Sequence, residues 1–136
     1  LAHSLGAFST MCLFHEKPEL ALVKVALLGT PGEATEFIDD YARILKTHPR
    51  VKENLKDYFM SYAGLESSYY STIRFAPSQT SEALLIHDTD DKEAPYRHAQ
   101  KIETLWQNAT LYTTTGFGHK LRDISVVDKV VAFFEG

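Results

Sequence analysis

The 136-residue sequence predicts an α/β fold built on a small parallel sheet of about three strands. The first observation is a nearly continuous apolar run over 22–28, which is typical of a strand covered on both faces of a parallel sheet. The second is that further strand-like segments, 82–87 and 109–114, alternate with helical patterns, as in βαβ units. A hydrophobic content of 44% and a charged content of 24% suit one globular domain.

The first elements expected along the chain are a helix and a strand. Phe8, Met11 and Cys12 recur at helical spacing and predict a helix over 6–16. The strand over 22–28 follows, and the Gly-Thr-Pro-Gly segment after it ends the strand.

The segment 33–80 interrupts the strand–helix alternation, and we interpret it as an inserted helical cap or lid. Amphipathic patterns predict helices over 33–46 and 51–62, and a weaker helical segment follows. Aromatic residues are frequent here, and they either line an acyl or aromatic pocket or pack the cap onto the rest of the chain. The candidate pocket residues are Phe37, Tyr41, Tyr58 and Tyr62.

Strand–helix alternation then resumes to the end of the chain. Ser125 and Asp128 resemble a capping box at the start of the last helix. The predicted elements are a strand over 82–87, a helix over 95–106, a strand over 109–114 and a helix over 125–135.

Composition and charge argue against several functional classes. The net charge of −4 gives no basic patch, so no nucleic-acid partner is expected. The histidines lack metal-ligand spacing, and no metal or other cofactor is expected. Cys12 is the only cysteine, which excludes an internal disulfide and suits a cytoplasmic location. No apolar run approaches the roughly 18 residues of a membrane span, so no membrane association is expected.

Three short segments carry the candidate chemistry. Ala2-His3-Ser4-Leu5-Gly6 matches the small-x-Ser-x-Gly pattern of a nucleophile elbow, with alanine in place of the first glycine. Asp91 follows the strand over 82–87, and His119 follows the strand over 109–114 in Gly-Phe-Gly-His. A serine needs a base to remove its proton, and that base needs an acid to orient it.

With these segments in this order, the chain resembles the C-terminal half of an α/β-hydrolase. The segment Leu84-Leu85-Ile86-His87-Asp88-Thr89-Asp90-Asp91-Lys92-Glu93-Ala94-Pro95 resembles the acid strand and loop of that family, and Thr114-Thr115-Gly116-Phe117-Gly118-His119 resembles its histidine loop. The order serine, acid, histidine is also that of the family. The resemblance implies a parallel-sheet α/β-hydrolase fold of which only the C-terminal part is present, over residues 1–136 with the cap over 33–80.

The resemblance also implies roles for individual residues. Ser4 is expected to be the nucleophile, His119 the general base and Asp91 the acid that orients His119, without a cofactor. Asp91 stands four positions before Pro95, as in the family, and Asp90 is the next choice. The plainer interpretations are a helix-capping serine, a surface histidine and a solvated turn aspartate.

The backbone N–H of Leu5 is expected to form half of the oxyanion hole, because it follows the nucleophile. The other half comes from a loop after an early strand of the fold, which is not seen in this sequence. Loss of one oxyanion donor costs about 10²–10³ in rate, so the chain alone is predicted to be inactive or very weakly active.

The expected function is cleavage of an ester, thioester or amide of a small, fairly apolar acyl substrate. We expect the chain to be part of a larger protein, whose N-terminal half, or another copy, covers the open edge of the sheet. The alternative is a non-catalytic binding or assembly module that retains the same fold.

Overall fold

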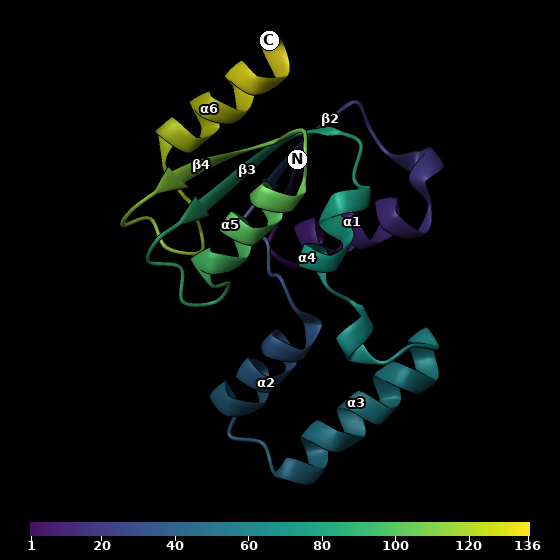
Figure 1. The fold of residues 1–136 in the computed structure, drawn as a ribbon. Coiled ribbons are helices and arrows are strands. Elements are labelled where there is room, and N and C mark those ends of the chain that lie inside the picture. Colours follow the sequence, from purple (N-terminus) through teal and green to yellow (C-terminus); the bar gives the residue numbers. More distant parts are fainter. The chain divides into compact units, whose positions relative to one another are not determined.

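The computed structural model describes residues 1–136 and divides into two compact units. The first unit comprises Leu1–Gly32 and Thr72–Gly136, and the second comprises Glu33–Ser71. Figure 1 labels the α-helices and most of the strands.

The first unit contains a parallel sheet whose strand order is β1-β2-β3-β4. The sequence predicts about three strands, and the structure adds a short fourth strand, β1, directly before Ser4. The two residues of β1 do pair with β2, through Ala2 opposite Leu27 and His3 opposite Leu28. A two-residue strand has no periodicity to detect. The strands are β1 (Ala2–His3), β2 (Lys24–Leu28), β3 (Glu82–Asp88) and β4 (Ala109–Thr114).

Helices cover both faces of this sheet, because alternate residues of each strand point to opposite faces. On one face, Val25, Leu27 and Leu85 pack with residues of α1 and α5. On the other face, Leu84 and Ile86 pack with residues of α6. The helices of this unit are α1 (Leu5–Glu16), α4 (Thr72–Phe75), α5 (Tyr96–Leu105) and α6 (Ile124–Glu135), with 3-10 turns at Pro18–Leu20 and Ala76–Ser78.

The cap of α6 differs from the capping box that the sequence predicts. Asp123, rather than Ser125, is the N-cap residue. Its Oδ1 accepts hydrogen bonds from the backbone N–H of Ser125 at 2.9 Å and from the Ser125 hydroxyl at 2.6 Å. Ser125 therefore lies inside the first turn, where its hydroxyl supports the cap.

The second unit is a helical pair made of α2 (Ala34–Ile44) and α3 (Pro49–Ala63), followed by a 3-10 turn at Ser67–Tyr69. Lys52 of α3 forms an ion pair with Asp39 of α2 at 3.3 Å. The ends of the unit meet, since the Ser71 hydroxyl donates to Glu33 at 2.9 Å. The inserted segment expected over 33–80 is longer than this unit, because residues 72–80 belong to the first one.

The chain leaves the first unit after Gly32 and returns to it at Thr72, and hydrogen bonds within the first unit join this junction. The backbone N–H of Thr72 donates to the carbonyl of Gly32 at 2.9 Å, and the Thr72 hydroxyl donates to the carbonyl of Pro31 at 2.8 Å. The N–H of Gly32 in turn donates to Nδ1 of the buried His98 at 3.0 Å. These bonds hold residues 32 and 72 side by side.

Candidate active site

Ser4, Asp91 and His119 all lie just beyond the carboxyl ends of strands. Ser4 follows β1, Asp91 follows β3 and His119 follows β4. Because the strands are parallel, their carboxyl ends lie along the same edge of the sheet, where ligands bind in open α/β sheets. The loop after β4 has to reach back past β3 and β2 to bring His119 to Ser4.

Ser4 occupies a strained turn between β1 and α1. Its φ of 53° and ψ of −122° lie outside the conformations that non-glycine residues normally adopt. The backbone holds it there, because its N–H donates to the carbonyl of Leu28 at 2.8 Å and its carbonyl accepts from Phe8 at 3.0 Å. A Cβ on Gly6 would lie 4.0 Å from that of Ala2, so the turn brings the two small residues of the motif together. This is the geometry of a nucleophile elbow.

The side chains of Ser4, His119 and Asp91 form a continuous chain of hydrogen bonds. Nδ1 of His119 lies 2.8 Å from Oδ2 of Asp91, and Nε2 of His119 lies 2.7 Å from Oγ of Ser4. An ionised carboxylate can only accept, so Nδ1 carries the proton. Nε2 of the neutral ring is then free to accept the proton of the serine hydroxyl. The geometry therefore supports removal of a proton from Ser4.

The carboxylate of Asp91 is held on both of its oxygens. Oδ1 accepts from the backbone N–H groups of Glu93 and Ala94, each at 2.8 Å. Oδ2 faces His119 and also Nε2 of the buried His87 at 3.3 Å. The alternative acid, Asp90, is used differently, since its Oδ2 accepts from the N–H of Gly116 at 3.1 Å. The structure therefore places Asp91, and not Asp90, against the histidine.

These contacts shift the pKa values of Asp91 and His119 in the directions that base catalysis needs. Burial would raise the pKa of Asp91, but hydrogen bonds from His119, His87, Ala94 and Glu93 lower it well below its ordinary 3.8. The hydrogen bond to Asp91 raises the pKa of His119 above 6.5, against the effect of burial, and the negative charges of Asp91 and Glu93 add to the rise. Asp91 is thus ionised whenever His119 is required as a base.

Asp88 ties the acid loop to the histidine loop, a role that sequence reasoning missed. This residue is fully buried. Its Oδ2 accepts from the Thr114 hydroxyl at 2.7 Å and from the N–H of Phe117 at 3.0 Å, while its Oδ1 accepts from the N–H of Asp90 at 2.9 Å.

Gly29 also supports the site, although the sequence indicates it only as the end of a strand. It follows β2, the strand between those that precede Ser4 and Asp91. A Cβ there would lie 3.3 Å from both Cε1 and Nδ1 of His119, and the φ of Gly29 is +54°. The absence of a side chain thus makes room for the histidine ring.

His3 contacts the backbone of the histidine loop rather than the reacting atoms. Its Nε2 lies 2.8 Å from the carbonyl oxygen of His119, and the two rings are 4.9 Å apart. Cys12 has a different character, since burial, with a smaller effect of Glu16, raises the pKa of its thiol to about 11. A thiol with so high a pKa is a poor nucleophile at neutral pH.

The expected oxyanion donor lies in the first unit, and the four expected pocket residues lie in the second. Leu5 begins α1 directly after Ser4, where backbone N–H groups have no partner within the helix. Phe37 is half-buried, whereas Tyr41, Tyr58 and Tyr62 are exposed. Their role in binding substrate stays a prediction.

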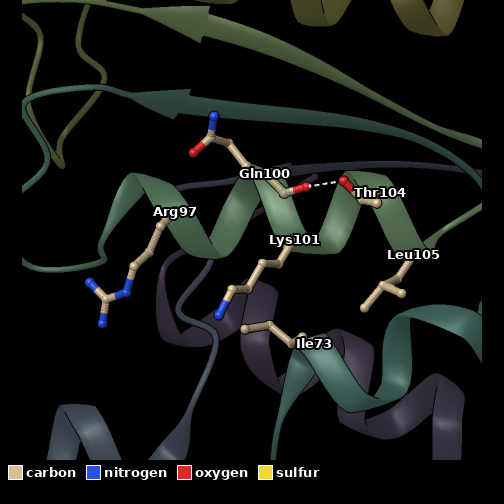
Figure 2. A pocket seen from close by; sticks show the side chains of 6 residues that line it. All are labelled: Ile73, Arg97, Gln100, Lys101, Thr104 and Leu105. Carbon is tan, nitrogen blue, oxygen red and sulfur yellow. Dashed lines mark hydrogen bonds between the residues drawn. The ribbon is translucent and has the colours of Figure 1, made fainter.

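The structure contains an open pocket of about 450 Å³ in the first unit, and none of the expected pocket residues lines it. It runs along α5, as Figure 2 shows, and none of its lining residues belongs to the chain of Ser4, His119 and Asp91. No cluster of three or more His, Cys, Asp or Glu side chains is arranged to hold a metal ion. The lining residues are Ile73, Arg97, Gln100, Lys101, Thr104 and Leu105.

Solved structures share this arrangement of strands and helices. BpoC of Mycobacterium tuberculosis H37Rv matches with a TM-score of 0.69 and 16% identity, over 98% of this chain and 65% of its own. MGS-M2, an alpha/beta hydrolase enzyme from a deep-sea metagenome library of the Medee basin, matches with a TM-score of 0.68 and 14% identity, over 96% and 62%. The chain has the α/β-hydrolase fold. A third α/β-hydrolase structure is CarC, a serine hydrolase involved in carbazole degradation, with a TM-score of 0.66 and 16% identity, over 98% and 61%.

The chain matches only part of each of these solved structures. This chain spans less than two thirds of the length of each of these three structures. No protein-family model and no curated protein matches the sequence. None of the helices is both long and apolar enough to cross a membrane.

Proposed function

We propose that the protein is a serine hydrolase that cleaves an ester, thioester or amide of a small, fairly apolar acyl substrate. The observation that carries the proposal is the hydrogen-bonded chain from Ser4 through His119 to Asp91, which starts at a strained elbow. The α/β-hydrolase fold supports it, and so does CarC, which is described as a serine hydrolase.

In this mechanism Oγ of Ser4 attacks the substrate carbonyl carbon while Nε2 of His119 takes the serine proton. The tetrahedral intermediate collapses, and His119 returns the proton to the leaving oxygen, sulfur or nitrogen as its bond to carbon breaks. Water, deprotonated by His119, then releases the acyl group from Ser4. Asp91 stabilises the charged form of His119 in both steps.

The oxyanion that forms in each step needs hydrogen-bond donors. We propose that the N–H of Leu5 supplies one, because the residue after the nucleophile does so in this fold. A second donor comes from another loop of the fold, and its loss would cost about 10²–10³ in rate. The rate of the reaction therefore depends on whether this second donor is present.

The test is covalent labelling with a neutral alkyl fluorophosphonate, read by intact mass. The chain and the natural full-length protein are compared, each with a Ser4→Ala variant. A single adduct that Ser4→Ala abolishes is expected, at the lower rate in the chain alone. Ser61→Ala removes an exposed hydroxyl from α3 and serves as the control that keeps the adduct.

Two results would contradict the proposal. An adduct that survives in Ser4→Ala would show that another residue is the nucleophile. A full-length protein that is folded by circular dichroism but forms no adduct would favour a binding or assembly module instead.

A further inference from the structure

Glu93 places a second carboxylate beside the candidate base. Its Oε2 lies 3.6 Å from Nε2 of His119, the ring nitrogen that contacts Ser4. The side chain of Glu93 is 66% exposed, whereas the side chain of Asp91 is fully buried. The exposed carboxylate of Glu93 therefore lies beside the reacting nitrogen of His119, whereas the buried carboxylate of Asp91 supports the other ring nitrogen.

The position of Glu93 is fixed by the same residue that orients His119. Oδ1 of Asp91 accepts from the backbone N–H of Glu93 at 2.8 Å and from that of Ala94 at 2.8 Å. The backbone of Glu93 is therefore held in place by hydrogen bonds, while its carboxylate is exposed to solvent. A charged side chain at this position interacts electrostatically with a molecule that approaches Nε2 of His119.

The part of a substrate that approaches Nε2 is the leaving group. In the mechanism proposed above, Nε2 gives its proton to the leaving atom as the bond to the acyl carbon breaks. The leaving group therefore lies beside Glu93, and the acyl group, which stays on Ser4, does not need to. A negative charge at that point attracts a cation and repels an anion.

The other groups that contact His119 do not pair with the carboxylate of Glu93. Asp91 contacts Nδ1 on the far side of the ring and is buried. His3 contacts the His119 carbonyl oxygen, and its ring lies 4.9 Å away. No lysine or arginine side chain pairs with Glu93. The carboxylate of Glu93 forms its only ion pair with His119.

We propose that Glu93 is a specificity-determining residue whose carboxylate forms a subsite for a positively charged leaving group. The preferred substrates are then esters, thioesters or amides with a fairly apolar acyl group and a cationic group on the alcohol, thiol or amine side. This inference rests on the proposed hydrolase function.

The test compares two thioesters of the same shape on the full-length protein. S-(2-trimethylammonioethyl) thioacetate carries a positive charge on its leaving group, and S-(3,3-dimethylbutyl) thioacetate is its neutral counterpart. The measured quantity is kcat/KM from thiol release. Glu93→Gln is expected to lower the cationic-to-neutral ratio by roughly two- to five-fold, the range of an exposed ion pair. Glu93→Lys should invert the preference, and added salt should weaken it in the wild type.

A second readout separates this role from a merely structural one. Removing the negative charge of Glu93 lowers the pKa of His119, so the acid limb of the pH profile for the neutral thioester should move to lower pH in Glu93→Gln. The cationic substrate is thus turned over less well by the variant, while the neutral one reacts better on the acid side. Glu19→Gln, on an exposed residue outside the site, is the matched control.

The outcomes distinguish the two proposals. A ratio that is the same in Glu93→Gln and in the wild type overturns the inference, as does turnover of neither thioester by a protein whose Ser4 still reacts with the fluorophosphonate. A protein whose Ser4 does not react at all overturns the proposed function, and the inference falls with it.

Discussion

At the scale of single residues, Gly29 shows how a missing side chain sets the position of another residue. A Cβ on residue 29 would meet two atoms of the His119 ring at 3.3 Å. The ring would have to give way by a few tenths of an ångström, and it is hydrogen bonded at both nitrogens. Any shift of this ring therefore changes its distance to Ser4 or to Asp91.

Gly29→Ala is thus predicted to slow the labelling of Ser4. A misplacement of 1 Å can cost about 10²-fold, so a smaller shift should cost roughly three- to ten-fold. The measurement is the rate of fluorophosphonate labelling. Gly64→Ala is the matched control, since residue 64 has a similar φ of +76° but no atom within 4 Å of the added Cβ. Equal labelling rates in the two variants would show that Gly29 is not needed to place His119.

At the scale of elements, the carboxyl end of β3 determines where the loop after β4 lies. Asp88, the last residue of β3, accepts from Thr114 at the end of β4 and from Phe117 in the loop that leads to His119. Thr89 adds a backbone hydrogen bond to the carbonyl of Thr114 at 2.9 Å. Two neighbouring strands are thus joined beyond the end of their regular pairing.

Asp88→Asn is predicted to loosen this connection. An amide nitrogen in place of one oxygen would face N–H or O–H donors, and a buried donor left without an acceptor costs about 1–3 kcal/mol. Urea unfolding should show the lower stability, and labelling of Ser4 should slow as well. Asp128→Asn, on an exposed residue of α6, is the control.

The effect of Asp88→Asn should also depend on pH. Burial opposes ionisation of Asp88, but hydrogen bonds from Thr114, Asp90, Phe117 and Gly118 lower its pKa below 3.8 in the folded protein. The contribution of the carboxylate is therefore present above pH 3.8 and is lost as the pH falls through the lower folded value. A difference from the wild type that stays constant as the solution is acidified would contradict this role.

The elements also show which parts of the fold the sequence could predict. The strand over 109–114 is found as expected, and β2 and β3 differ from their predicted ranges only at the ends, because these short segments alternate with helical patterns as in βαβ units. β1 could not be predicted, since its two residues form a strand only by pairing with Leu27 and Leu28. The cap of α6 was misplaced because Asp123 and Ser125 are both good cap residues.

At the scale of the whole molecule, the site combines what a motif can show with what only folding can show. Ser4 and His119 are separated by 115 positions, and their motifs predict the pairing that the structure displays. The contacts of Gly29 and Glu93 with His119 follow from how the loop after β4 crosses the end of β2. Such contacts join segments distant in the sequence, and neither residue type signals them.

The division of the chain into two units leads to the last prediction. The first unit closes its own junction, because Thr72 bonds to the carbonyls of Gly32 and Pro31, and His98 accepts from the N–H of Gly32. Replacing residues 33–71 by a short Gly-Ser linker should therefore leave the first unit folded, since closing a short flexible loop costs little. Thermal unfolding by circular dichroism should stay cooperative, and Ser4 should still react with a small fluorophosphonate.

A variant of the shortened protein tests whether the close contact between Gly32 and His98 stabilises the junction. A Cβ on Gly32 would lie 2.6 Å from Cγ of His98 and 2.9 Å from Cδ1 of Ile73, so Gly32→Ala forces the buried His98 ring to move. It should lower the unfolding temperature of the shortened protein, whereas Gly116→Ala, with no atom within 4 Å of the added Cβ, should lower it less. A shortened protein that fails to fold even with Gly32 intact would mean that residues 33–71 stabilise the first unit beyond this junction.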